Sequence, residues 1–315
     1  MAVTVATHAA AGPAPAPSRP GRSSRPRRPR LPLLLIAPAA LILLLVQAYP
    51  LGRVAALSFQ GWGLAQIFSD QPAPFVGLDN FERILSDPVF WAALRRTLVL
   101  AAAMVTLTML FGVGIALLME RLPAWLRRVV MSVLVLAWAV PTFVSTQVFA
   151  WMTQQNFGVF NYLFGLGQHN WYINPVEGLA VATAVVVWGA VPFIAVTTYA
   201  GLTQVPAELV ESARMDGASG LQVLRRVTLP LLRPVLGIQI VLSVIWDFQV
   251  FNQIWLLRNA SPEPEYQTLG IYAYMQAYQG HDYGYAGAVA LVTVLLLAVL
   301  LVVYVRQLIR MGDLT

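Results

Sequence analysis

The sequence predicts an all-α protein that crosses a membrane several times. Hydrophobic residues make up 58% of the 315 residues and charged residues only 11%, whereas a soluble domain carries about 25% charged residues. Six apolar stretches are each long enough to cross the hydrocarbon core of a bilayer, which takes about 20 helical residues. We place these spans near 31–57, 97–119, 129–151, 178–202, 235–257 and 284–308.

The arginines of the chain indicate its orientation. All 20 basic residues are arginines, and most of them fall in the segments that lie inside if the N-terminus is inside. Cytoplasmic loops carry such a positive excess, so both termini and residues 204–234 are expected in the cytoplasm. The net charge of +6 arises at these membrane edges and does not indicate a nucleic-acid partner. Arg95 and Arg96, at the outer edge of the second span, are accommodated by snorkelling towards water.

Residues 1–30 are rich in Ala, Pro, Ser and Arg and contain no acid. Such a composition cannot build a core, so we predict a disordered cytoplasmic tail, followed by one transmembrane domain over 31–315. A signal peptide made of the tail and the first apolar residues is the alternative. The apolar run extends towards Phe59 and further spans follow, which favours an uncleaved first span.

One long polar segment, residues 204–234, interrupts the hydrophobic half of the chain. The turn chemistry of Asp216-Gly217 divides it into two short helices, and residues 219–222, Ser-Gly-Leu-Gln, have the spacing of a capping box that starts the second helix. Pro230 and Pro234 are expected to end that helix before the next apolar run. The spacing alone fits either a surface loop or an element that docks a partner.

Asp247 is the most informative single residue, because it lies near the middle of the fifth span. An acid at the centre of a membrane helix costs about 2.5–3.5 kcal/mol on insertion, so it should contact protein or water rather than lipid. Gln239, Ser243 and Val250 share its helical stripe, and Trp246 flanks it. This stripe either lines a substrate pathway, which the acid favours, or joins helices by hydrogen bonds. Three further polar residues of the span fall towards the other side of the helix: Gln249, Asn252 and Gln253.

The third and fourth spans offer matching surfaces. Trp138, Thr142 and Ser145 follow one another at helical spacing, and Pro141 loosens the backbone hydrogen bonding between them. In the fourth span, residues 188–193 combine two aromatic residues with a small pair and a proline. Each feature alone is typical of a kink or a close helix contact. Together with the acid of the fifth span, they outline a cavity of aromatic side chains with a few hydrogen-bonding groups, which suits a neutral, hydroxyl-rich ligand.

The sequence carries no signature of an enzyme. No histidine lies in an apolar run to activate a serine, and there is no Gly-rich phosphate loop, no His-Glu-x-x-His pattern and no cysteine. We therefore expect no catalytic residue, metal or cofactor on this chain. If ATP drives transport through it, ATP and Mg²⁺ bind to another subunit. A secondary transporter that uses Asp247 as a proton carrier is the alternative.

Residues 211–218, Glu-Ser-Ala-Arg-Met-Asp-Gly-Ala, followed by 227–230, Val-Thr-Leu-Pro, and by Pro234, resemble the EAA signature of ABC importer permeases. The signature is Glu-Ala-Ala, Asp-Gly-Ala three residues later, and then Ile-x-Leu-Pro with a further proline. Ser212 replaces the usual Ala and Leu224 the usual Phe, and both departures are mild.

The resemblance extends over most of the chain, from about residue 31 to 310, and is to the maltose-type, F-kind permease subunit of carbohydrate ABC importers. The pattern Leu-Thr-Gly-Gly-Gly-Pro that is usual after the fifth span is here Leu-Arg-Asn-Ala-Ser-Pro, at 257–262. Three shorter stretches agree with the carbohydrate branch: Phe75–Phe81, Ala139–Pro141 and Asn156–Gly158.

The resemblance implies a type I importer fold with six transmembrane helices and a cytoplasmic coupling helix. Such a permease pairs with a second, similar permease, two cytoplasmic ATP-binding subunits bind below, and an external solute-binding protein delivers the sugar. The coupling helix docks into the ATPase, which implies that coupling involves Glu208, Glu211, Ala213, Arg214, Asp216, Gly217 and Ala218.

The resemblance also implies where the sugar, a di- or oligosaccharide, makes contact. Matching the family's motifs in the third, fourth and fifth spans places the contacts on Trp138, Thr142, Ala190, Phe193, Ser243, Trp246, Asp247 and Val250. Asp247 stands where the maltose permease has Asn, so the identity of the sugar stays open. A permease for glycerol phosphate is the alternative within the family. A site for a phosphorylated ligand is expected to contain a basic residue, and none of these positions has one.

Overall fold

The computed structural model describes residues 31–69 and 71–312, and the predicted tail 1–30 lies outside them. The described residues are helical, as predicted, and their only extended pairing is an isolated bridge between Gln60 and Phe75. The chain forms two compact units, one ending at Tyr49 and the other beginning at Pro50.

The first unit contains α1 (Leu31–Leu43) and the π-helical turn η1 (Leu44–Ala48). The next helix, α2 (Tyr49–Leu57), leads into the second unit. Residues 35–57 are apolar enough to cross a membrane, in agreement with the predicted first span.

Three further spans lie where the sequence predicts them: α5 (Pro88–Arg121), α9 (Pro175–Leu202) and α15 (Tyr283–Gly312). The first of these begins at Pro88 rather than near 97, because the Asp87 side chain accepts a hydrogen bond from the backbone N–H of Val89 at 2.8 Å and so caps the helix. Asn174 and Pro175 start α9 in the same way.

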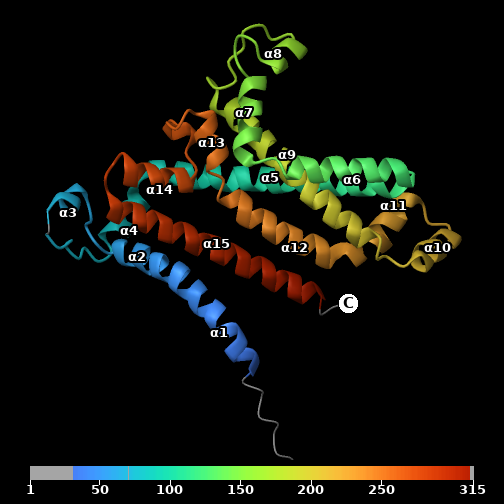
Figure 1. Cartoon of the computed structure of the whole chain (residues 1–315), viewed down its shortest axis with the longest axis horizontal. Helices are drawn as coiled ribbons and strands as arrows, with labels where there is room; N and C mark the ends of the chain where they lie inside the picture. The colour runs from blue at the N-terminus through green and yellow to red at the C-terminus, as the bar shows by residue number, and fades with distance from the viewer. Residues whose placement is uncertain (1–30, 70, 313–315) are drawn as a thin grey trace, which may run out of the picture. The chain divides into compact units, whose positions relative to one another are not determined.

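The core of the second unit lies between α5 and α9, which pack against each other near its centre (Figure 1). Met104 from α5 and Val185 from α9 belong to this core, and both are almost fully buried. At Gly112 the two backbones approach so closely that an added Cβ would lie 2.6 Å from the side chain of Ile194. Small residues at such contacts are typical of helices that pack inside a membrane.

The predicted third span is broken. It consists of α6 (Ala124–Trp138) and α7 (Thr142–Met152), whose axes differ by 96°. The predicted span over 129–151 is thus a bent pair of helices, and the bend lies at the proline expected to loosen its backbone. Pro141 is the cause, because it lacks an N–H and its ring clashes with the preceding turn of helix. The described residues thus contain five continuous helices that are long and apolar enough to span a membrane, or six spans if the bent pair counts as one.

The start of the predicted fifth span is also wrong, because Pro230 and Pro234 do not end the preceding helix. The chain is helical from α11 (Gly220–Val223) through the π-helical turn η2 (Leu224–Thr228) and α12 (Leu229–Phe248). Pro230 occupies the first turn of α12, directly after η2, where the hydrogen-bonding register shifts and no N–H is needed. The helix α12 then ends at Phe248, and α13 (Asn252–Leu257) is a separate short helix.

Short helices lie at the two ends of the second unit. Figure 1 shows α10 (Ala207–Met215) and α11 at the end opposite to α4 (Asp79–Ser86) and α14 (Leu269–Tyr278). This separation fits a protein whose predicted inner and outer segments lie on different sides of a membrane. The other short helices belong to predicted outer segments: α3 (Leu64–Phe68), α8 (Val159–Leu163) and η3 (Pro264–Tyr266).

A hydrogen-bonded cluster around Asp87 joins α5, α14 and α15 at the end of the second unit that is predicted to face outwards. Its Oδ2 accepts hydrogen bonds from the hydroxyl of Tyr272 and, at 2.8 Å, from that of Tyr285. Burial raises the pKa of Asp87, but the hydrogen bonds from Tyr272 and Tyr285 outweigh this effect and hold the pKa below its usual value. A carboxyl group with a depressed pKa stabilises the fold above its unfolded pKa, about 3.9, and this stabilisation is lost as pH falls through the folded pKa.

We expect Asp87→Ala to lower the free energy of unfolding by about 1–3 kcal/mol at neutral pH, because two hydroxyls lose a charged acceptor. The Tm of the purified protein measures this. The difference from the wild type should shrink as pH falls below about 4, since the wild-type carboxylate then becomes protonated. Asp79→Ala, which removes an exposed acid of α4, is the matched control with a smaller effect. A difference that stays constant down to low pH would contradict the role of the ionised group.

Candidate functional site

A cavity of about 340 Å³ opens where the bend between α6 and α7 and the break between α12 and α13 meet the middle of α9. Its walls come from the junction of α6 and α7, from residues 185–193 of α9, and from residues 246–253, where α12 ends and α13 begins. Irregular backbone is tolerated at membrane depth where it lines a cavity or is buried in protein. Seven of the eight residues matched to sugar contacts line this cavity: Trp138, Thr142, Ala190, Phe193, Trp246, Asp247 and Val250.

Aromatic side chains form one wall of the cavity. The rings of Trp138 and Phe193 stack with their centroids 5.9 Å apart, and Phe193 meets Trp246 edge-to-face at 5.6 Å. Trp138 comes from α6 and Trp246 from α12, and about half of each residue remains exposed. Three helices thus present aromatic surface to one cavity, which is the type of wall on which the C–H side of a sugar ring packs.

Asp247 supplies a buried acceptor to this cavity. Asp247 is only 5% exposed, and its Oδ2 atom has no hydrogen-bond partner among the described residues. A buried carboxylate oxygen without a partner is costly, so the site favours a ligand that brings hydrogen-bond donors. The hydroxyl groups of a sugar are such donors. No basic residue lines the cavity, so nothing there pairs with the charge of a phosphorylated ligand.

Ser243 is the one candidate that does not line the cavity, although it is buried one helical turn before Asp247. A further turn back, the side-chain oxygen of Gln239 accepts a hydrogen bond from the hydroxyl of Thr198 at 3.1 Å. The side-chain nitrogen of Gln239 donates to the hydroxyl of Thr197. The inner part of the polar stripe therefore joins α12 to α9, while its Asp247 end reaches the cavity.

Three polar residues expected on the other side of the fifth span also line the cavity, and that expectation is wrong. The helix ends at Phe248 and the chain turns before α13, so helical spacing does not apply beyond this point. The sequence did contain a signal for their role, because three amide side chains occur within five consecutive positions of an otherwise apolar segment. The lining residues are Gln249, Asn252 and Gln253.

Residues 204–223, which the resemblance predicts to couple to an ATPase and which we call the coupling segment, form the predicted helix–turn–helix. After α10, Gly217 has a φ of +81°, and the N–H of Ala218 donates to the carbonyl of Ala213 at 3.0 Å. Glycine adopts this left-handed conformation without strain. The capping box is present, because Ser219 and Gln222 bond each other's backbone N–H groups.

The residues matched to ATPase coupling form two groups by exposure. The charged ones and Gly217 are exposed, whereas Ala213 and Ala218 are half-buried at the turn. Met215 is 88% exposed and Leu209 is also exposed, so the segment presents apolar as well as charged side chains. Met215 was not among the residues predicted to contact the ATPase, although an apolar residue directly before the turn at Asp216-Gly217 can be recognised in the sequence. The exposed candidates are Glu208, Glu211, Arg214, Asp216 and Gly217.

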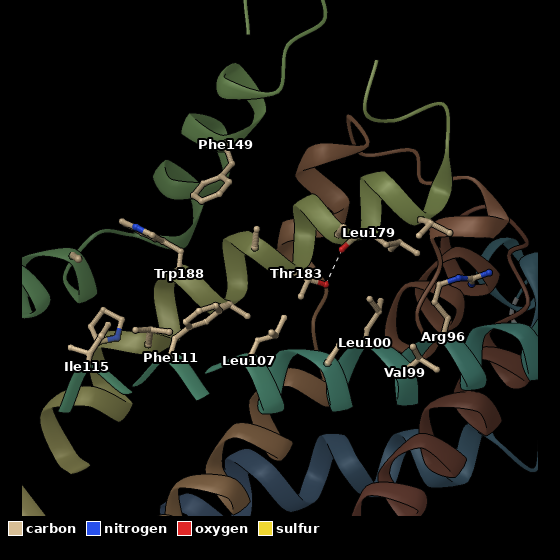
Figure 2. Close-up of a pocket in the computed structure, with 18 of the residues that line it drawn as sticks. Arg96, Val99, Leu100, Leu107, Phe111, Ile115, Phe149, Leu179, Thr183 and Trp188 are labelled. Carbon is tan, nitrogen blue, oxygen red and sulfur yellow. Dashed lines mark hydrogen bonds between the residues drawn. The ribbon is translucent and has the colours of Figure 1, made fainter. Parts of the chain in front are cut away.

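A second, larger cavity of about 1060 Å³ lies between α5, α6 and α9 (Figure 2). Figure 2 shows Leu107 and Phe111 of α5 below it and Trp188 of α9 above it, with Arg96 at one end. The hydroxyl of Thr183 in its wall already donates to the carbonyl of Leu179 at 2.8 Å. Because its long walls are apolar, this groove offers few hydrogen bonds to a sugar, and the candidate site is the smaller cavity.

The family and the relatives that the chain matches are all transport permeases. Residues 109–310 match the family described as "Binding-protein-dependent transport system inner membrane component". The chain is 36% identical to the diacetylchitobiose uptake system permease protein of Streptomyces coelicolor over 286 residues, which cover 89% of this chain and 87% of that protein. It is 32% identical to the trehalose/maltose transport system permease protein of Thermococcus litoralis over 237 residues, with coverages of 74% and 79%.

The fold is shared with a solved structure, a bacterial alginate ABC transporter in complex with an alginate pentasaccharide-bound periplasmic protein. The TM-score is 0.74 at 20% sequence identity, and the match covers 87% of this chain and 92% of that one. The arrangement of helices is therefore that of an ABC importer permease.

Proposed function

The chain belongs to the family of inner-membrane components of binding-protein-dependent transport systems, and we propose that it is the permease subunit of an ATP-driven importer for a di- or oligosaccharide. The observation that carries the proposal is the cavity around Asp247, where three aromatic rings and a buried, unpartnered carboxylate oxygen face one space. Relatives that are permeases for diacetylchitobiose and for trehalose or maltose support a sugar as the cargo.

The proposed assembly contains a second, similar permease, two ATP-binding subunits that hold ATP and Mg²⁺, and an external sugar-binding protein. The absence of a phosphate loop from this sequence requires the ATPase to be separate, and the periplasmic protein bound to the alginate transporter is a precedent for the sugar-binding partner. The exposed coupling segment, α10 to α11, is the proposed ATPase contact. The arginine bias favours placing it, with both termini, in the cytoplasm.

In the proposed cycle, ATP binding closes the two ATPase subunits and moves the coupling segments. Because α11, η2 and α12 are continuous in the helix that ends beside Asp247, a displacement of the coupling segment is transmitted along α12 to the cavity wall. The permeases then switch between two arrangements as rigid bodies. The cavity receives sugar from the binding protein in the outward arrangement and releases it inward after hydrolysis.

Uptake into right-side-out membrane vesicles that contain the complete importer tests the proposal. Diacetylchitobiose, trehalose and maltose are offered outside with the binding protein, and ATP is loaded inside. We expect uptake of at least one sugar that requires both ATP and the binding protein and resists a protonophore. Uptake that needs neither and is abolished by the protonophore would instead identify a secondary transporter coupled through Asp247. Competition by glycerol phosphate but by none of the sugars would identify the alternative within the family.

A further inference from the structure

Four aromatic side chains form a continuous ladder between the cavity and the outer surface: Phe251, Trp255, Tyr274 and Tyr278. Phe251 stacks on Trp255 with ring centroids 5.4 Å apart, and both rings meet Tyr274 edge-to-face, at 5.4 and 5.1 Å. Tyr274 in turn stacks on Tyr278 at 5.4 Å. The first two rungs come from α13 and the residue before it, and the last two lie one turn apart on the neighbouring α14.

The ladder begins inside the candidate site and ends in the open. Phe251 lines the cavity together with Asn252 and Gln253. Phe251 and Trp255 pack on the core with part of each side chain left accessible, whereas Tyr274 is 39% and Tyr278 63% exposed. Exposure therefore increases from the cavity outwards, and the accessible surface is aromatic at every step.

The mutual contacts distinguish this ladder from an interfacial belt. Aromatic residues that anchor a helix at the membrane surface lie with their rings at the level of the headgroups. Here four rings contact one another, and the innermost, Phe251, lines the same cavity as Asp247. A pyranose ring has C–H groups that pack on an aromatic ring and hydroxyl groups at its edge, and amide side chains stand at the inner end to receive those hydroxyls.

We propose that this aromatic ladder is the path along which the sugar slides from the outer surface into the cavity. The ligand class is a saccharide with an accessible C–H side on its rings, such as one built of gluco-configured or N-acetylglucosamine units. The contact between successive rungs lets a sugar ring touch the next rung before it leaves the last. This inference rests on the proposed function, since it concerns the same cavity.

Replacement of the two outer rungs tests the path. In vesicles with the complete importer, we use whichever of diacetylchitobiose, trehalose and maltose the wild type takes up fastest. Tyr274→Leu combined with Tyr278→Leu should lower uptake about tenfold, because leucine keeps the apolar bulk but not the flat ring. ATPase stimulation by the sugar-loaded binding protein should stay within about twofold of wild type, since docking and coupling are intact. Tyr274→Phe with Tyr278→Phe should restore uptake.

The matched control is Phe157→Leu with Tyr162→Leu, which removes two exposed aromatic residues from a different outer segment, and its uptake should be unchanged. Wild-type uptake by the Tyr274/Tyr278 leucine variant would overturn the proposal. So would a parallel loss of ATPase stimulation, which would assign these residues to docking, or a phenylalanine variant as slow as the leucine variant. If the wild type takes up none of the sugars with ATP, the proposed function itself fails, and the ladder with it.

Discussion

Asp247→Ala is expected to slow sugar uptake by roughly 10- to 100-fold while the assembled importer keeps its ATPase. A hydrogen bond to a charged group contributes about 1.5–3 kcal/mol, and each 1.4 kcal/mol corresponds to about tenfold. The same change removes a buried acid that costs about 2.5–3.5 kcal/mol to insert, so the variant should be at least as thermally stable as the wild type. Uptake rate and Tm, measured on one preparation, should therefore move in different directions.

Two variants sharpen this test. Ser243→Ala removes a buried hydroxyl one turn away that does not line the cavity, and it should leave uptake unchanged. Asp247→Asn keeps the shape and one oxygen acceptor but not the charge, so a loss much smaller than that of Asp247→Ala would assign the role to hydrogen bonding. Normal uptake with normal sugar preference in Asp247→Ala would remove Asp247 from the site.

Gly217→Asp is expected to uncouple the importer. Gly217 has a φ of +81°, where a residue with a Cβ is strained, so the turn between α10 and α11 should change its angle and misplace the coupling helix. The space around Gly217 is open, so folding should survive. We expect uptake to fall at least about tenfold, while the ATP-binding subunits still hydrolyse ATP and the protein is still inserted. Uptake and ATPase activity, measured in the same vesicles, give the amount of sugar transported per ATP hydrolysed.

Gly220→Ala is the matched control, because Gly220 lies in the same segment, also has open space around it, and does not have a positive φ. It should transport like the wild type. Glu211→Lys reverses an exposed charge on α10 and should uncouple without altering the turn. If Gly217→Asp and Glu211→Lys both transport at the normal rate, the segment does not couple.

Local chemistry predicted the coupling segment well. The turn at Gly217 and the capping box at Ser219 depend on side chains within four residues of each other, so the sequence contains all of their geometry. Proline effects were harder to predict because they depend on the neighbouring backbone. Pro141 breaks a helix, whereas Pro230 follows a π-helical turn that removes the need for its missing N–H.

The sequence predicted most of the residues that line the cavity, but not the shape of the cavity. Seven residues matched through the family's motifs in three spans line one cavity, and six of them lie before Phe248, where helical spacing still applies. The seventh, Val250, follows the end of the helix and was matched by the motif. Beyond Phe248 the helix ends, and Asn252 and Gln253 lie on the cavity side, contrary to helical spacing. A break of this kind depends on tertiary packing, which periodicity does not contain.

The break in the third span also bears on the depth of the proposed sugar site. Trp138, where α6 ends beside the cavity, lies ten positions after Arg128, which the arginine bias predicts to be near the inner membrane surface, and ten helical steps rise about 15 Å. This is about half of a hydrocarbon core of about 30 Å, so the predicted orientation would place the cavity near the bilayer midplane. In the proposed cycle, one such central position would serve both loading and release, and the helices around the cavity would make the larger movement.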